Sequence, residues 1–422
     1  MKKTSFLFAA MLVAALGSGF SPVSISSVHA RADESAEKPK NTVRKEFGVA
    51  LPDIQKLLDE KQYPQAMEKI AVLDAMDKKT PYEEFALHRM RAIVASSTNN
   101  TPLLAASFSA MISSEFLKDN EKLRLMEGLA GTFYNEKKYD EAIQWANRML
   151  EKDPSNLQTH NLIAKAYYLK QDYPASIKKI NEILALDDAA KRAPTEESLR
   201  LLASCYQHLK DNAGYTTVLE RMVAHYPTRE YWGDMIYRTE HKAGFSDRLR
   251  LDLYRLMIAT GNMDDAGQYV EMAELALLAG LPAEAKTAMD AGYAANLLGT
   301  GKEGAKHKQL RDRVNKQATE DLKTLDAGEA SAKTAKTGTG LVNIGYNYVI
   351  NGQADKGIPL MEQGIAKGGL KSADEAKLHL GMAYLKSGNR DKAKEVFQSL
   401  QGNDGAADIG RLWLLVRPLA DK

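Results

Sequence analysis

One hexapeptide in the sequence has the residue types of a cofactor-binding loop. Residues 299–304 read Gly-Thr-Gly-Lys-Glu-Gly, which is the glycine spacing that brings a dinucleotide pyrophosphate to a helix N-terminus. Such a loop must follow a β-strand, whereas residues 283–298 have helical periodicity and no βαβ unit is predicted anywhere in the chain. The spacing also differs from that of a phosphate-binding P-loop. We interpret the motif as a glycine-rich turn and predict no cofactor.

Histidine and cysteine are too sparse to predict a metal site. Seven of the eight histidines follow residue 30, none belongs to an H-E-x-x-H motif, and no two stand four residues apart. The single cysteine, Cys205, excludes an intrachain disulfide and a Cys-based zinc cluster. It lies in a helical pattern with Leu199, Leu202, Ala203 and Tyr206. We therefore expect a small buried side chain and not a catalytic thiol, and no metal.

Adjacent carboxylates are the remaining candidates for catalysis, as general acid and base. They stand in predicted turns or at predicted helix starts, where a carboxylate caps free N–H groups and complements the helix dipole. No G-x-S-x-G nucleophile setting occurs in the chain. We therefore predict that the chain is not an enzyme. The pairs are Asp140-Glu141, Asp187-Asp188 and Asp264-Asp265.

The composition is that of a globular protein with balanced charge. The chain has 422 residues, with 57 Lys and Arg against 55 Asp and Glu, a formal net charge of +2. Binding to nucleic acid or another polyanion normally requires a basic excess, so this function class is disfavoured.

The first 30 residues have the pattern of a secretory signal peptide. Lys2 and Lys3 precede an apolar run at residues 6–17, and Ser-Val-His-Ala closes the segment, so we expect cleavage after Ala30. The apolar run is shorter than the roughly 20 residues of a membrane span. Cleavage would remove two lysines and leave 55 basic and 55 acidic residues. We expect an exported, periplasmic protein whose residues 31–46 form a flexible polar tail.

One pattern recurs along most of the chain. Its first two clear copies are 34 residues apart, and a third follows a short insertion at residues 188–195. A fourth clear copy lies near the C-terminus, and weaker copies surround residues 54, 272 and 344. The small and aromatic positions that define the clear copies are Leu129-Ala130 with Phe133, Ile163-Ala164 with Tyr167, Leu202-Ala203 with Tyr206, and Leu380-Gly381 with Tyr384.

Each copy predicts two amphipathic helices joined by a turn. Apolar residues recur at helical spacing, and small residues such as Ala130 and Ala142 allow the two helices to approach closely. Pro154 and Pro227 end second helices, because proline cannot continue the backbone hydrogen bonds. One hairpin cannot bury its apolar face alone, so successive copies must stack.

This pattern resembles the tetratricopeptide repeat family. The resemblance covers most of residues 47–405 and is clearest at 123–227 and 374–402. Tyr215 stands where a small residue is usual, and residues 231–247 are too long for a standard turn. The resemblance implies an all-α solenoid of stacked helix-turn-helix repeats, in a right-handed superhelix.

The departures from the repeat suggest the domain organisation. We expect an N-terminal array over residues 47–298, a polar helix and linker over 299–340, and C-terminal repeats with a capping helix over 341–422. Residues 327–340, rich in Ala, Gly, Lys and Thr, are the predicted linker.

The resemblance also implies a binding surface, because ligands of this family commonly lie against the first helix of each repeat. That surface mixes cations, amides and tyrosines, which suits extended peptide and acidic side chains; the alternative is a solvated helix face. Asn161 and Lys165 stand in inverted order relative to the family's carboxylate clamp, which disfavours that mode. The predicted partner-binding residues are Arg124, Glu127, Tyr134, Asn135, Asn161, Lys165, Tyr168, Arg200, Gln207 and His208.

These features favour a non-catalytic periplasmic scaffold that binds protein partners in a cell-envelope complex. The irregular array is similar to exported members that accompany TonB/ExbB transport systems or serve envelope assembly. The alternative is a cell-wall or polysaccharide binding module, for which three tryptophans are few. An enzyme is the third hypothesis.

Overall fold

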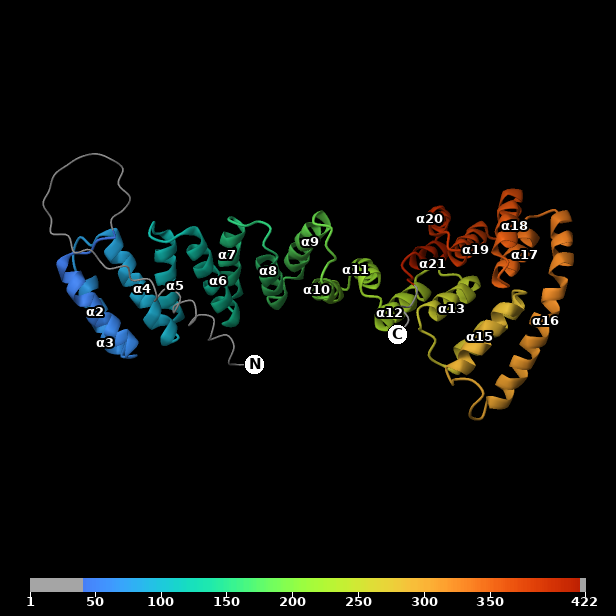
Figure 1. Ribbon diagram of the computed structural model, residues 1–422, viewed down its shortest axis with the longest axis horizontal. Coiled ribbons are helices and arrows are strands. Elements are labelled where there is room, and N and C mark those ends of the chain that lie inside the picture. Colours follow the sequence, from blue (N-terminus) through green and yellow to red (C-terminus); the bar gives the residue numbers. More distant parts are fainter. Residues whose placement is uncertain (1–40, 418–422) are drawn as a thin grey trace. The chain divides into compact units, whose positions relative to one another are not determined.

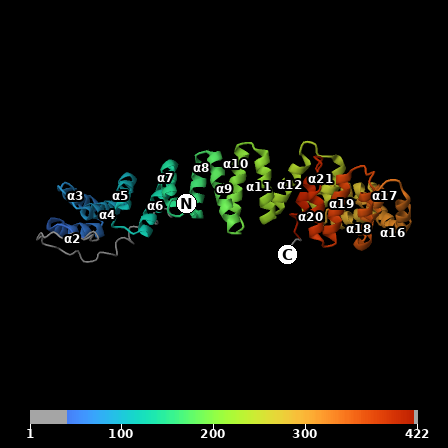
Figure 2. The same ribbon diagram turned by 90° about the horizontal axis from the view of Figure 1, so that it is seen from above.

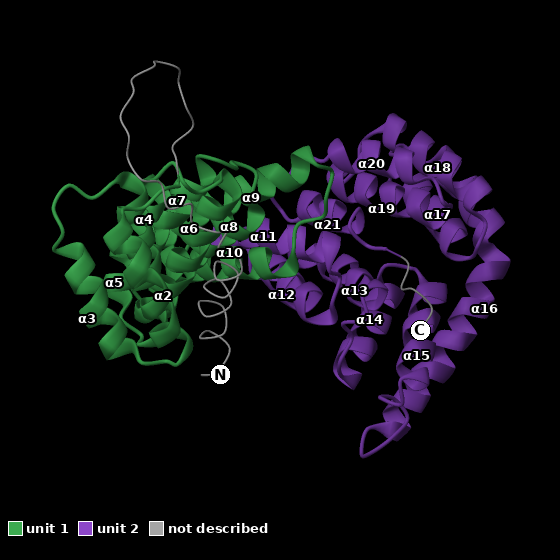
Figure 3. Cartoon of the chain, turned by 60° about the vertical axis from the view of Figure 1, so that its left-hand side comes forward, with its two compact units in different colours: residues 1–211 green, residues 212–422 purple. Residues whose placement is uncertain are grey.

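The computed structural model describes residues 41–417, which form helices without a β-strand in that range (Figure 1). The predicted signal peptide lies outside the described residues. The chain forms two compact units, residues 1–211 and 212–422 (Figure 3). None of the helices between residues 41 and 417 has the length and hydrophobicity needed to cross a bilayer. The all-α repeat architecture is confirmed.

Unit 1 consists of paired helices that follow one another along the chain, and Figure 2 shows α6 to α9 side by side in this order. The helices are α2 (Lys45–Asp59), α3 (Tyr63–Asp74), α4 (Pro81–Ser97), α5 (Thr101–Ser113), α6 (Asp119–Asn135), α7 (Tyr139–Leu150), α8 (Leu157–Leu169), α9 (Tyr173–Ala189) and α10 (Glu196–His208).

Unit 2 contains shorter pairs, one long helix and a short 3-10 helix. These are α11 (Asn212–His225), α12 (Arg229–Glu240), η1 (Asp247–Leu249), α13 (Arg250–Ala259), α14 (Ala266–Leu278), α15 (Pro282–Ala294), α16 (Gly304–Thr334), α17 (Thr339–Ile350), α18 (Ala354–Lys367), α19 (Ala373–Lys386), α20 (Arg390–Gln398) and α21 (Ala406–Trp413).

Small side chains hold the paired helices close together, as the repeat pattern predicts. Ala130 on α6 and Ala142 on α7 are completely buried. In the next pair, the Ser176 hydroxyl donates to the carbonyl of Ala164 at 2.9 Å. A larger residue at any of these positions would separate the two helices and expose their apolar stripes.

The turn between paired helices repeats a left-handed backbone conformation. Lys137, Gln171 and Lys210 occupy corresponding positions in three successive repeats, with φ of 61°, 64° and 56°. In unit 2 the same place is taken by Gly352 and Gly388, with φ of 81° and 79°. Glycine adopts this conformation without steric cost, whereas the lysines and glutamine adopt it at a small one.

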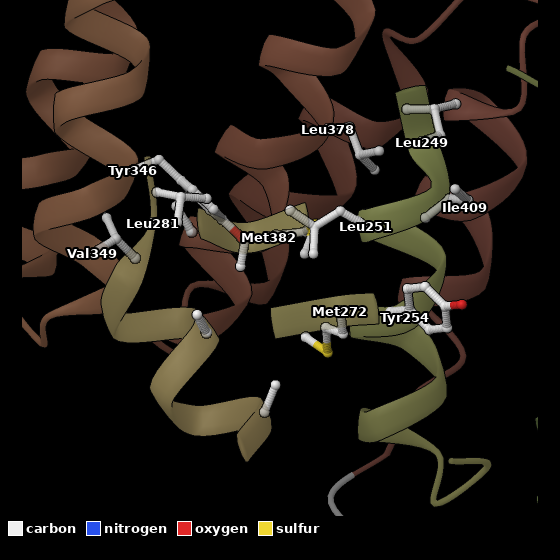
Figure 4. Close-up of a cluster of buried hydrophobic side chains, with 14 of the residues drawn as sticks. Leu249, Leu251, Tyr254, Met272, Leu281, Tyr346, Val349, Leu378, Met382 and Ile409 are labelled. Atoms are coloured by element: carbon white, nitrogen blue, oxygen red, sulfur yellow. The ribbon is translucent and has the colours of Figure 1, made fainter. Parts of the chain in front are cut away.

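The last helix of unit 2 returns to its first ones. The backbone N–H of Ser246 donates to the Asp404 carbonyl at 2.8 Å, and Lys242 pairs with Asp408 of α21 at 2.6 Å. The main apolar core of unit 2 includes residues from Leu249 to Ile409 (Figure 4). Unit 2 is therefore closed upon itself by contacts between residues more than 150 positions apart.

The predicted linker at residues 327–340 differs from the structure, in which α16 extends to Thr334. Leu325 and Ala332 are buried against α17 and α18, and the hydroxyl of Tyr348 donates to Asp326 at 2.8 Å. The helix has only one narrow apolar stripe, which is why the sequence looked like a linker. The two compact units divide at residues 211 and 212, not in the segment 299–340.

The expected flexible tail also ends earlier than residue 46. Val43 is buried, and Arg44 Nη2 lies 2.9 Å from the carboxylate of Glu83, which is itself buried. A buried carboxylate requires such a partner, so the segment from Val43 onward is held against α4.

We predict that Gly357→Ala destabilises unit 2. Gly357 on α18 meets Gly345 on α17, and a Cβ at Gly357 would overlap the Gly345 carbonyl and the Val349 side chain. Forcing a methyl group into this contact should cost about 1–3 kcal/mol of unfolding free energy, measured by urea denaturation. Gly131→Ala is the matched control, because it is also helical and meets nothing within 4 Å; a neutral or stabilising effect is expected there. Equal stability of both variants would contradict the proposed close approach.

Candidate functional site

The ten predicted partner-binding residues lie on the first helices of three successive repeats in unit 1. We call their common surface the A-helix face. Its members are Arg124, Glu127, Tyr134 and Asn135 on α6, Asn161, Lys165 and Tyr168 on α8, and Arg200, Gln207 and His208 on α10.

Polar contacts join α8 and α10 along this face. Lys165 Nζ lies 2.8 Å from the carboxylate of Glu197, and the Ser198 hydroxyl donates to Asn161 Oδ1 at 3.5 Å. The structure therefore adds Glu197, which the sequence did not predict, to the A-helix face. The ammonium group of Lys165 is therefore already paired with one carboxylate.

Aromatic rings gather at one end of the face. The Tyr168 hydroxyl lies 2.8 Å from Ser204 Oγ and 3.3 Å from His208 Nε2. The His208 ring stacks on Tyr173, with ring centres 4.5 Å apart and an angle of 2° between the planes. Of the ten predicted residues, Tyr168 and His208 are thus brought together directly.

A similar aromatic contact occurs one repeat earlier in the chain, at Tyr134. Its ring meets Tyr139 edge-on with ring centres 5.7 Å apart. The pKa of Tyr134 is raised, first by burial and then by the nearby Tyr139 and Glu197. Its hydroxyl therefore stays protonated at neutral pH and can donate a hydrogen bond.

Several members of the face have no partner within the described residues. Arg124, Glu127, Asn135 and Gln207 are exposed and make no hydrogen bond or ion pair there, and Arg200 approaches only a carboxylate one turn earlier, at 3.9 Å. The face thus offers free cationic, anionic and amide groups. These groups can bind the backbone and charged side chains of another polypeptide.

In the range 41–417 no three His, Cys, Asp or Glu side chains are arranged to hold a metal ion. Burial raises the pKa of Cys205, and its sulfur lies 3.5 Å from Ser176 Oγ. A protonated, buried thiol is a structural residue.

The sequence did not predict a buried ionic cluster in unit 2. Arg255 on α13 donates to both carboxylate oxygens of Glu284 on α15, at 2.7 and 2.6 Å, and to Asp252 at 2.6 Å. His379 Nε2 on α19 lies 2.9 Å from Asp252, and the Tyr346 ring on α17 lies 5.0 Å from the guanidinium. Asp252 and Arg255 are a charged pair one turn apart inside a mostly apolar run, and this signal could have revealed the cluster.

Two cavities flank the cluster. One, of about 300 Å³, is lined by polar side chains that include Arg248, Asn343, Glu375 and His379. The other, of about 360 Å³, is lined mainly by apolar side chains such as Ile258, Met272, Met382 and Trp413. The cluster therefore lies between a polar cavity and a mainly apolar one. Both cavities are lined by residues of α13, α17 and α19.

Comparison with known proteins identifies the repeat. Models of the tetratricopeptide repeat match residues 114–156 and 375–404. The chain thus contains tetratricopeptide (TPR) repeats in both units. No curated protein matches it.

Solved structures, one of them a TPR domain, are similar at low identity. The TPR domain of P58(IPK) has 11% identity, over 87% of this chain and 97% of that chain, at a TM-score of 0.20. Naa15/Naa10 bound to HypK-THB has 12% identity, over 86% and 70%, at a TM-score of 0.22. The human IFIT1 dimer with m7Gppp-AAAA has 11% identity, over 94% of both chains, at a TM-score of 0.22.

The two units use their TPR helices differently. In unit 2, Tyr346 and His379 come from the first helices of the C-terminal TPR repeats and contact the α13 cluster, with their rings stacked 4.9 Å apart. The surface that these helices would offer to a partner is thus partly occupied by the same chain. In unit 1, the exposed members of the A-helix face have no such cover among residues 41–211.

We expect Asp252 to stabilise unit 2 in a pH-dependent way. Burial raises the pKa of Asp252, but the charges of His379 and Arg255 outweigh burial and lower it from 3.8 to about 2. A lowered carboxyl pKa contributes stability above pH 4 that is lost as the pH falls toward 2. Asp252→Asn should therefore be less stable than the wild type near neutral pH. The difference should shrink by about 2 kcal/mol between pH 4 and pH 2.

Urea denaturation at several pH values measures this difference. Asp53→Asn is a control, because this exposed carboxylate pairs with Lys69 in unit 1 and an exposed pair contributes at most about 1 kcal/mol. A stability difference for Asp252→Asn that stays constant down to pH 2 would show that the charge cluster does not hold unit 2 together.

Proposed function

We propose that this TPR protein is a non-catalytic scaffold of the bacterial cell envelope, which binds partner proteins in the periplasm through the A-helix face of unit 1. TPR repeats are protein-interaction modules. The periplasmic location, the envelope complex and a role beside TonB-type transport or envelope assembly are our proposals. The signal-peptide pattern and the similarity in repeat organisation support them.

The observation that carries the proposal is the difference between the two units. Two repeats of unit 1 present unpaired side chains on this face, namely Arg124, Glu127 and Asn135 on α6 and Gln207 on α10. In unit 2, by contrast, α13 lies against the corresponding helices. Free polar groups on more than one repeat can bind an extended segment along several points at once. Electrostatic complementarity of this kind selects a partner more than it determines the affinity.

Site-specific photocrosslinking in cells tests this face. A photoreactive phenylalanine at Arg124 or at Gln207 should capture the same envelope protein, identified by mass spectrometry. The control positions are Gln144 on α7 and Lys178 on α9, which are equally exposed but lie on second helices. Equal capture at all four positions would contradict partner binding through the A-helix face.

The export proposal has its own test. Mass spectrometry of the protein purified from its native host should show a mature N-terminus at Arg31, and osmotic shock should release it with periplasmic proteins. Ala30→Arg should block processing and leave the full-length form, because signal cleavage requires a small residue at this place. Retention of Met1 in the wild-type protein would contradict export by cleavage.

Binding to cell wall or polysaccharide is the second candidate for the same face. The edge-on pairs of Tyr134 with Tyr139 and Tyr168 with Tyr173 favour it, since sugars stack on aromatic rings. Retention on insoluble cell wall, lost in Tyr134→Ala and Tyr168→Ala, would replace the scaffold proposal.

A further inference from the structure

The largest of the cavities described for unit 2 shares no lining residue with the A-helix face or with the buried ionic cluster. It has a volume of about 720 Å³ and is lined by residues of α11, α12, the segment after α12, and α21. Ligand sites typically have volumes of roughly 300–1,000 Å³. Its walls are joined by the contacts that close unit 2, because Arg411 of α21 lies 2.8 Å from Glu220 of α11.

The charged groups in the cavity wall neutralise one another. Lys242 pairs with Asp408 at 2.6 Å, Arg411 lies 3.0 Å from the same carboxylate, and Arg238 pairs with Asp234 at 2.8 Å. An ionic ligand would have to break one of these pairs. A neutral ligand with many hydroxyl groups can instead donate to the carboxylates and accept from the cations while the pairs persist.

Hydroxyl groups supply further acceptors in the wall. Thr216, Thr217 and Thr239 line the cavity, and each hydroxyl donates to a backbone carbonyl of its own helix, at 2.9, 3.0 and 2.8 Å. Their hydroxyl protons are therefore engaged in these hydrogen bonds, and their oxygens remain able to accept another hydrogen bond. This fixed orientation suits a ligand that brings its own O–H donors.

An exposed aromatic ring stands at the same cavity. Tyr237 is 59% exposed, and one side of its ring stacks on His241, with ring centres 4.0 Å apart. His241 is fixed in turn, because its Nδ1 lies 2.8 Å from the Tyr237 carbonyl. The Tyr237 ring is thus an oriented apolar platform beside polar groups, which is the combination that the C–H face and the hydroxyl rim of a pyranose ring require.

We propose that the cavity between α11, α12 and α21 binds a neutral oligosaccharide. One sugar ring stacks on Tyr237, and its hydroxyl groups bind the paired charges Lys242–Asp408 and Arg411–Glu220. A peptide fits this wall less well, because Met235 is the one large aliphatic side chain that lines it among the described residues. Such a site lies outside the A-helix face, so unit 2 would recognise a glycan while unit 1 binds protein.

Titration of the mature chain with neutral tetrasaccharides tests the proposal. Chitotetraose, cellotetraose and maltotetraose serve as probes, and saturation-transfer NMR and isothermal titration calorimetry measure binding. At least one probe should bind, and Tyr237→Ala should weaken that binding about tenfold, as expected for the loss of one stacked ring. Tyr237→Phe, which keeps the ring, should stay within about threefold of the wild type.

The controls separate a lost site from a lost fold. Tyr237 is mostly exposed, so its variants should melt at the wild-type temperature, and the crosslinking at Arg124 and Gln207 should be unchanged in them. Binding of none of the three probes, or equal binding by the wild type and Tyr237→Ala, would overturn the proposal. So would displacement of a bound probe by an unstructured peptide but not by a second saccharide.

Discussion

A helical hairpin with an apolar face on both sides cannot be stable in water alone, and this constraint shapes the whole molecule. Each hairpin must be covered by the next, so the chain becomes a series of stacked pairs. The distance between the two helices of a hairpin is set by a few small side chains. Ala130 with Ala142 and Ser176 with Ala164 fix it in unit 1, and Gly345 with Gly357 fixes it in unit 2. Only the helix faces that this stacking leaves exposed can bind partners.

The two units meet the constraint in different ways. Unit 1 continues pair by pair and leaves the first helices of its repeats with unpaired polar side chains. Unit 2 instead joins its beginning to its end, and Arg255 then lies between α15, α17 and α19, where two carboxylates and a histidine surround it. A buried cation without these partners would be strongly unfavourable. The cluster therefore specifies how the helices of unit 2 are arranged around it.

The repeats could be predicted from the sequence because their signal is local. Leu129-Ala130 and Ile163-Ala164 recur at a fixed period, and the helical spacing around them predicts both helices of each pair. The closure of unit 2 could not be predicted, since Lys242 and Asp408 are 166 positions apart and neither residue is unusual in its own surroundings. The A-helix face was predicted in part. The contacts of Tyr168 with His208 follow from repeat position, whereas Glu197 joins the face only because α8 and α10 bring it to Lys165.

The return of α21 to α13 has a consequence for the order in which the molecule forms. Contacts in unit 1 are between near neighbours in the chain, so its pairs can assemble one after another, beginning at the N-terminal end of the unit. Unit 2 has to wait for residues 404–413, because Asp404 and Asp408 supply the contacts that close it. Until they arrive, the apolar core between Leu249 and Ile409 is incomplete. The final tenth of the chain thus decides when the second half becomes a folded body.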